Sequence, residues 1–248
     1  MNRDETFKKI KAMYEEYMRL REQVARELVI PEDESWRNPL SSHYVFQDIL
    51  RETRKALIDL TIQEFQDENP NLKIDTSKLY EHLNNVMQDD FKEQVILSWL
   101  KEEYSGKERE LSLKNIIENA RKLMGHDGLH GKRIKLELWL TLSYSGTVFS
   151  YDLEKINAVE KLAKIILENA DPRTVEGNEI SKRVFLARED FIFKKHKLFT
   201  GPIKSFRLYK NGRLDLEFKT EEDARKVYEV MKGEEIKPLL AQTNKVMI

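Results

Sequence analysis

Apolar residues in the first quarter of the chain recur with the period of an α-helix. In residues 5–29 and again in 44–65 they follow one another at steps of three and four, which places them on one stripe of each helix. The stripes consist of Ile10, Met13, Tyr17, Leu20 and Val24, and of Phe46, Ile49, Leu50, Leu57, Leu60 and Phe65. Segment 31–42 contains prolines and is predicted to be a loop. Two long helices joined by a short loop favour an antiparallel hairpin. A coiled-coil dimer is the alternative, although the pattern lasts for only about two or three heptads.

Three shorter helices are predicted after this hairpin, over 76–87, 90–104 and 112–124. Their expected caps are Thr76, Asp89 and Ser112, because each side-chain oxygen can accept a hydrogen bond from a free backbone N–H group. Gly106 and Gly125 stand where helices are expected to stop.

The period changes to two at residue 133. Apolar and polar residues alternate through Arg133–Ser143, as in a strand with one buried face. Val148–Tyr151 is predicted to be a second, short strand after a turn at Ser145-Gly146. A helix then follows from Asp152 to about Asn169. A short helix or strand is expected over 180–186.

The end of the chain carries the clearest local pattern. Strands 203–209 and 213–218 flank Lys210-Asn211-Gly212, and Asn-Gly is the strongest short hairpin signal because both residues tolerate positive φ. Thr220 with Asp223 approximates a capping box, which predicts a last helix running to about Met231.

These elements predict an α+β fold. Residues 1–128 form a helical region that begins with the long-helix hairpin, and residues 129–248 form a small antiparallel sheet with helices. The boundary is expected near 125–131.

Composition excludes several chemistries. The chain of 248 residues has no cysteine, which excludes disulfides, Cys-ligated zinc and thiol catalysis. It has a charged N-terminal segment and no run of about 18 apolar residues, so we expect a cytoplasmic protein without a membrane helix. No phosphate-binding loop and no G-x-S-x-G motif is present, and no catalytic residue or cofactor is indicated.

Positive charge is concentrated in residues 182–213. Only Glu189 and Asp190 oppose the basic side chains there, and aromatic residues alternate with them. The basic residues are Lys182, Arg183, Arg188, Lys194, Lys195, Lys197, Lys204, Arg207, Lys210 and Arg213. Lysine and arginine neutralise phosphates, and aromatic rings stack on unpaired bases, so this segment is the candidate nucleic-acid-binding site. The alternative interpretation is that the aromatic rings enter the core while the lysines are solvated.

The segment 125–132 holds the only other candidate chemistry. His126 and His130 are four residues apart with Asp127 between them, a spacing that holds a metal on a helix. Three glycines interrupt the segment and no third ligand is indicated, so we expect a flexible loop from helix to strand, or an anion site formed by backbone N–H groups.

Two short patterns carry a resemblance. Gly131–Ile134, leading into a strand, and Tyr209–Phe218 together resemble an uncharacterised domain family of phage, plasmid and other mobile-element proteins, sometimes attached to DNA methyltransferases. The resemblance would cover roughly residues 90–235, and the chain departs from it at Arg213, where a small polar residue is usual. It implies a setting among mobile elements and an association with DNA, but no catalytic residue.

A weaker likeness concerns 214–218 and 222–226, which are similar to the third strand and second helix of an RNA-recognition domain. The aromatic residues that such domains stack on bases are missing from the expected central strands.

Three functions are therefore weighed. The first is a non-enzymatic nucleic-acid-associated accessory protein of a phage or mobile element, which binds DNA or RNA through the basic segment. The alternative is a protein-binding factor whose helical half grips a host complex, for example as an inhibitor of a defence system. The third is a nuclease with dispersed acidic residues.

Overall fold

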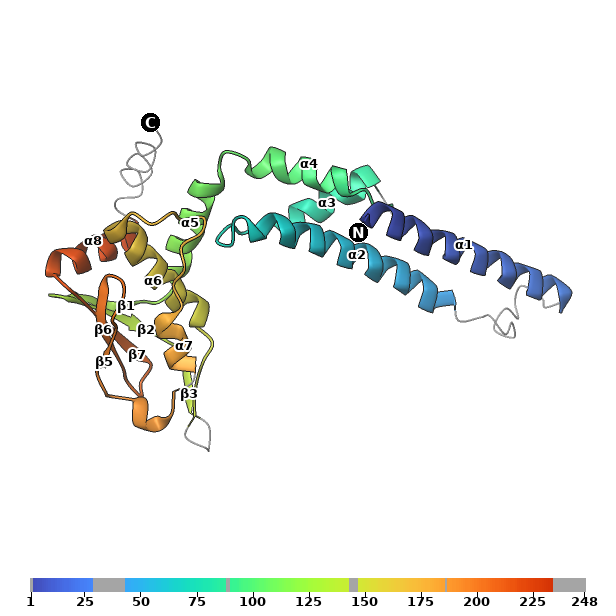
Figure 1. The fold of residues 1–248 in the computed structure, drawn as a ribbon. Coiled ribbons are helices and arrows are strands. Elements are labelled where there is room, and N and C mark those ends of the chain that lie inside the picture. Colours follow the sequence, from blue (N-terminus) through green and yellow to red (C-terminus); the bar gives the residue numbers. More distant parts are fainter. Residues whose placement is uncertain (1, 29–42, 88–89, 143–146, 186, 234–248) are drawn as a thin grey trace. The chain divides into compact units, whose positions relative to one another are not determined.

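A computed structural model describes residues 2–28, 43–87, 90–142, 147–185 and 187–233 (Figure 1). The chain forms two compact units, Met1–Asp67 with Ile74–Ser105, and Glu68–Lys73 with Gly106–Ile248. The first is helical and the second combines helices with a small antiparallel sheet, which confirms the α+β prediction.

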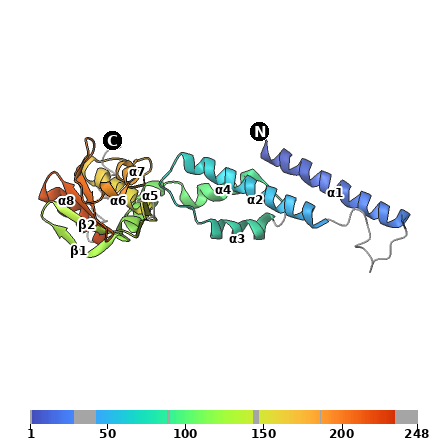
Figure 2. The same cartoon turned by 90° about the horizontal axis from the view of Figure 1, so that it is seen from below.

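In the described residues of the first unit the helices are α1 (Arg3–Glu27), α2 (His43–Asp67), α3 (Thr76–Met87) and α4 (Glu93–Tyr104). Arg3, at the start of α1, donates a hydrogen bond to Thr61 in the second half of α2. Tyr14, eleven positions later in α1, lines the same hollow as Leu50 in the first half of α2. Contacts that run in opposite directions along the two helices make α1 and α2 antiparallel, as Figure 2 also shows. The predicted hairpin is confirmed, and its predicted loop, 31–42, lies outside the described residues.

The predicted apolar stripes are buried only in part. Phe7 is the one buried apolar residue of α1, and it packs against Phe91 with ring centroids 5.9 Å apart. Met13 and Leu20 of the predicted stripe are 66% and 47% exposed, and Ile49 and Leu60 of α2 are also exposed. Burial in α1 is confined to its first two turns, where Arg3 forms ion pairs with Glu64 and Glu93 of α2 and α4.

Asn2 caps α1 by accepting a hydrogen bond from the Glu5 N–H, whereas the starts of α3 and α4 depend on carboxylates other than the predicted caps. Asp75, not Thr76, accepts from the backbone of the first turn of α3, at Lys78. Helix α4 begins at Glu93, whose N–H is capped by Asp4 of α1, while Asp89 lies outside the described residues. A cap supplied by a distant helix leaves no signal in the local sequence.

The second unit is built on a five-stranded antiparallel sheet, in the order β1-β2-β7-β6-β5. The strands are β1 (Met124–His130), β2 (Arg133–Glu137), β5 (His196–Lys197), β6 (Ile203–Leu208) and β7 (Arg213–Phe218). A separate two-stranded sheet pairs β3 (Leu140–Leu142) with β4 (Val148–Ser150). The helices are α5 (Glu108–Arg121), α6 (Leu153–Glu168), α7 (Glu179–Phe185) and α8 (Glu221–Lys232), with a 3-10 turn η2 at Glu189–Phe191.

Two strand predictions are corrected. Segment 125–131, expected to be a flexible loop, mostly belongs to edge strand β1, whose register shifts between Met124 and Leu129. The long strand predicted over 133–143 divides, because β7 pairs with residues 133–137 and β4 with 140–142. The predicted turn at Ser145-Gly146 lies outside the described residues.

The boundary between the units also differs from the prediction. Helix α5, assigned by sequence to the helical region, contributes Leu113, Ile117 and Ala120 to the core of the second unit. Because α5 begins at Glu108, its predicted cap Ser112 lies inside the helix and is buried there. The units therefore divide between Ser105 and Gly106 rather than near 125–131.

Candidate nucleic-acid interface

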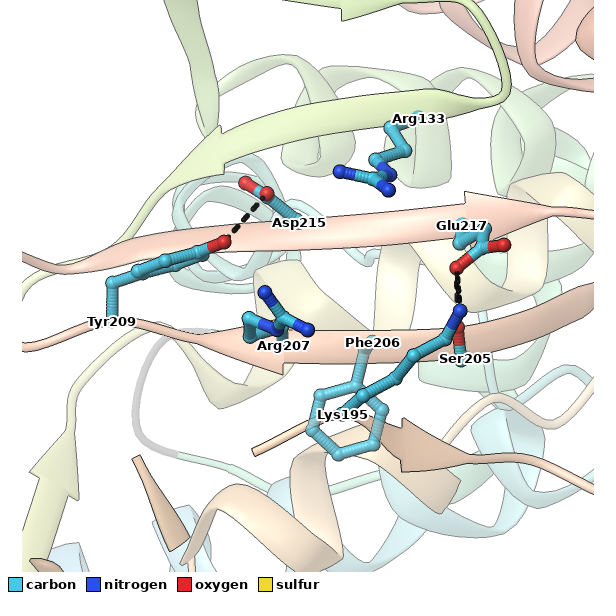
Figure 3. Close-up of a pocket in the computed structure, with 8 residues that line it drawn as sticks. All are labelled: Arg133, Lys195, Ser205, Phe206, Arg207, Tyr209, Asp215 and Glu217. Carbon is cyan, nitrogen blue, oxygen red and sulfur yellow. Dashed lines mark hydrogen bonds and ion pairs between the residues drawn. The ribbon is translucent and has the colours of Figure 1, made fainter. Parts of the chain in front are cut away.

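Strand alternation gives the five-stranded sheet two different faces. One is apolar: Ile134, Leu136, Leu214, Leu216 and Phe218 are buried in the core that α5, α6 and α8 complete. The opposite face is polar, and Figure 3 looks onto its centre. By strand register its charged members are Arg133, Lys135, Lys195, Lys197, Arg207 and Arg213, and the carboxylates Glu137, Asp215 and Glu217. We call these nine residues the charged face; its six cations exceed its three anions.

The centre of the charged face holds carboxylates from β7 between cations of neighbouring strands. Arg133 of β2 lies opposite Glu217, and Arg207 of β6 lies opposite Asp215. Lys195 forms an ion pair with Glu217, which also accepts a hydrogen bond of 3.0 Å from Ser205. The bond from Lys195 lowers the pKa of Glu217, so this carboxylate stays ionised and acts as an internal counterion.

Asp215 is the more buried of the two carboxylates, with 6% of its surface exposed. Its oxygens lie 3.0 Å from Arg213 Nε and 3.2 Å from the Tyr209 hydroxyl, which donates to it. The Arg213 guanidinium also covers the Tyr209 ring, 3.8 Å from its centroid. Bonding to Tyr209 and the charge of Asp215 raise the pKa of Arg213, so its charge is permanent but internally used.

Arg133 and Arg207 are placed differently. Neither guanidinium forms an ion pair with a carboxylate in the described part of the chain, although both line the hollow that contains Asp215 and Glu217. The hollow measures about 50 Å³, room for only a few water-sized groups. Such a site suits the oxygens of a surface-bound anion rather than an enclosed small molecule.

The structure brings four of the ten predicted basic residues onto the charged face: Lys195, Lys197, Arg207 and Arg213. The remaining six lie on α7, around η2 and the hairpin turn, or at the β6 irregularity: Lys182, Arg183, Arg188, Lys194, Lys204 and Lys210. Three of these six pair with local carboxylates, in the pairs Arg183–Glu179, Lys194–Asp190 and Lys210–Glu189.

Sequence reasoning missed Arg133 and Lys135. They lie about 50 residues before the basic segment and join its face only because β2 pairs with β7. The polar positions of the alternation in 133–137 were the available signal, but a strand pattern does not reveal its partner.

The aromatic residues of the segment divide between core and surface. Phe206 is buried, and Phe191 stacks on His196 with centroids 3.6 Å apart, beside Phe206. Phe185, Phe193 and Phe199 are exposed. The outward positions of central strand β7 are all charged, so bases cannot stack there as they do on an RNA-recognition domain.

Other candidate chemistry finds little support. Among the residues whose placement is described, no group of three His, Asp or Glu side chains is arranged to hold a metal ion; the side chain of His126 is not among them. No helix in the described ranges has the length and apolar character needed to cross a membrane.

Comparison of the chain with protein-family models, curated proteins and solved structures finds no match.

Proposed function

We propose that the protein binds nucleic acid without catalysis, through phosphate contacts on the charged face of the second unit. The observation that carries this proposal is the pair Arg133 and Arg207, two guanidinium groups without carboxylate partners among the described residues. A guanidinium is planar and offers paired N–H donors that match two phosphate oxygens. Strand β7 separates the two arginines, which pair with positions two residues apart on it. This sets their backbones about 12 Å apart, so that they can engage different phosphates.

The carboxylates limit the strength of this binding. Asp215 and Glu217 repel phosphate, but each is neutralised by a neighbouring cation, Arg213 or Lys195. The excess charge on the face then comes mainly from Arg133, Lys135, Lys197 and Arg207. Contacts of this kind release counterions and carry no sequence information, so we expect weak binding with strong salt dependence and little sequence preference.

The test is a fluorescence-anisotropy titration with single-stranded DNA, duplex DNA and RNA at about 50 and 200 mM salt. The variant Arg133→Gln/Arg207→Gln should bind at least about tenfold more weakly than the wild type at the lower salt. The matched control, Arg225→Gln/Lys226→Gln, removes the same charge from exposed positions of α8, in the helical layer, and should bind like the wild type. Equal affinities for both variants, or no binding at the lower salt, would reject the proposal.

A second candidate is a protein partner bound by the helical unit. Met13 and Leu20 of α1 are exposed at 66% and 47%, and exposed apolar side chains on one helix are typical of a surface that binds protein. A pull-down with Met13→Glu/Leu20→Glu as the comparison, repeated after nuclease treatment, separates the two candidates. A partner lost with the variant but kept after nuclease would favour protein binding. An origin in a phage or mobile element stays a prediction from the resemblance.

A further inference from the structure

Two strongly exposed aromatic side chains lie together at the end of β2. Trp139 is 73% exposed and Tyr151 78%, and their rings meet edge to face with centroids 6.2 Å apart. Large aromatic side chains stabilise a fold mainly when they are buried. A fold gains little from leaving two of them in water side by side, so their position calls for a role outside the core.

The backbone under this pair is held firmly. Because Leu140 pairs with Ser150, Trp139 and Tyr151 occupy the next cross-strand positions of the β3–β4 hairpin. The buried carboxylate of Asp152 accepts a hydrogen bond of 2.6 Å from the Trp139 N–H and forms an ion pair with Lys155 of α6. The side chains are thus exposed from an ordered backbone, which reduces the entropy lost when a ligand binds.

Two neighbouring hollows form a path from Trp139 to Lys135 and Arg213 of the charged face. Trp139 lines a hollow of about 430 Å³ together with Lys210 and Asn211 of the hairpin turn. A neighbouring hollow of about 380 Å³ is lined by Lys135 and Arg213, and Arg213 lies over Tyr209, which lines the hollow of Figure 3.

Glu137 gives the two ends of this path different preferences. Glu137 lines both the hollow beside Trp139 and the neighbouring hollow beside Lys135. Its carboxylate repels phosphate there but does not repel a neutral base. The end near Trp139 therefore suits bases, whereas the end near Arg133 and Arg207 suits phosphates.

We propose that Trp139 and Tyr151 stack on unpaired bases of a strand whose phosphates lie on the charged face. The inference rests on the proposed function and deepens it, since it makes single-stranded nucleic acid the preferred ligand. In a duplex the bases are already stacked and their faces are closed to a side chain. Stacking on an aromatic residue is tolerant of sequence because every base has a π-face.

The experiment compares a labelled unpaired oligothymidine with a blunt duplex of the same length, by anisotropy at about 50 mM salt. The variant Trp139→Leu/Tyr151→Leu should bind the oligothymidine about tenfold or more weakly, which corresponds to the loss of one stacked base, and should bind the duplex unchanged. Tyr80→Leu is the control: it removes an aromatic residue of α3, in the first unit and outside the proposed interface, and should have no effect.

Equal binding of both ligands, with no effect of the double variant, would overturn this inference and leave the proposed function standing. A variant that loses single strand and duplex equally would also overturn it, because a stacking role is specific to unpaired bases. Failure of the wild type to bind either ligand would instead reject both proposals.

Discussion

Gly212 lies in the turn between β6 and β7. Its φ is +84°, as the Asn-Gly pattern predicted, but Asn211 is not among the residues with positive φ. The backbone N–H of Tyr209 donates to the Arg213 carbonyl, so the turn holds the three residues predicted between the strands, Lys210-Asn211-Gly212. It is not a two-residue I′ turn, which needs positive φ at both positions. A Cβ on Gly212 would lie 2.2 Å from the Leu138 carbonyl oxygen, a contact between distant segments that no local pattern contains.

We predict that Gly212→Val lowers the free energy of unfolding by at least about 1–3 kcal/mol, because the substitution combines a strained φ with a backbone clash. Urea denaturation measures this change. Asn211→Ala, one position earlier, serves as the control. Asn211 has a negative φ, so we expect this substitution to change the free energy of unfolding much less. A melting temperature for Gly212→Val equal to that of the wild type would contradict the close approach to Leu138.

Glu160 is a buried carboxylate on α6, and no sequence motif singles it out. Both its oxygens accept from the Ile180 N–H, at 3.1 and 3.2 Å, at the start of α7. Burial raises its pKa from 4.5 to about 7, aided by the charge of Glu179 and opposed by that hydrogen bond and by Lys164.

The folded protein therefore holds this proton at pH values where the unfolded chain releases it. The contribution of Glu160 to the free energy of unfolding is fully present below about pH 4.5, and it is lost as the pH rises through about 7. We predict that Glu160→Gln, which keeps an acceptor for Ile180, removes this decline, worth up to about 3 kcal/mol. The urea midpoint of unfolding, measured between pH 4.5 and 8, tests this prediction. If the midpoint changed with pH in the same way for the variant and the wild type, the pKa of Glu160 would not be raised in the folded protein.

At the scale of elements, local pattern predicted most helices and the final hairpin. Helical periodicity and the Thr220–Asp223 capping box are complete within a few residues, so they could be found without knowledge of the fold. The division of 133–143 between two sheets could not, because it depends on pairing with β7 and β4. The same pairing adds Arg133 and Lys135 to the charged face, so two of its six cations were beyond the reach of sequence reasoning.

Helix α1 provides a prediction at this scale. Phe7→Ala should destabilise the helical unit by about 3–5 kcal/mol, because Phe7 is 2% exposed and packs on Phe91. Met13→Ala, on the same helix but 66% exposed, should change stability by less than about 0.5 kcal/mol. Thermal unfolding followed by circular dichroism compares the two. Similar losses for both would mean that the whole predicted stripe is buried.

At the scale of the molecule, the second unit has one sheet face buried by helices and one rich in cations. A net charge of −1 for the whole chain conceals this arrangement. The fold needs the apolar face for its core, whereas nothing in packing requires six cations on the other. We therefore propose that Arg133 and Arg207 bind phosphates there.

The most direct test is the dependence of affinity on salt for the wild type and Arg133→Gln/Arg207→Gln, measured on one oligothymidine. Each phosphate contact on a single strand contributes about 0.7 to the slope of log affinity against log salt concentration. The account predicts a slope that is shallower by about 1.4 in the double variant, with the folded state intact. An unchanged slope and affinity would show that the two arginines do not contact phosphate, and would contradict the account.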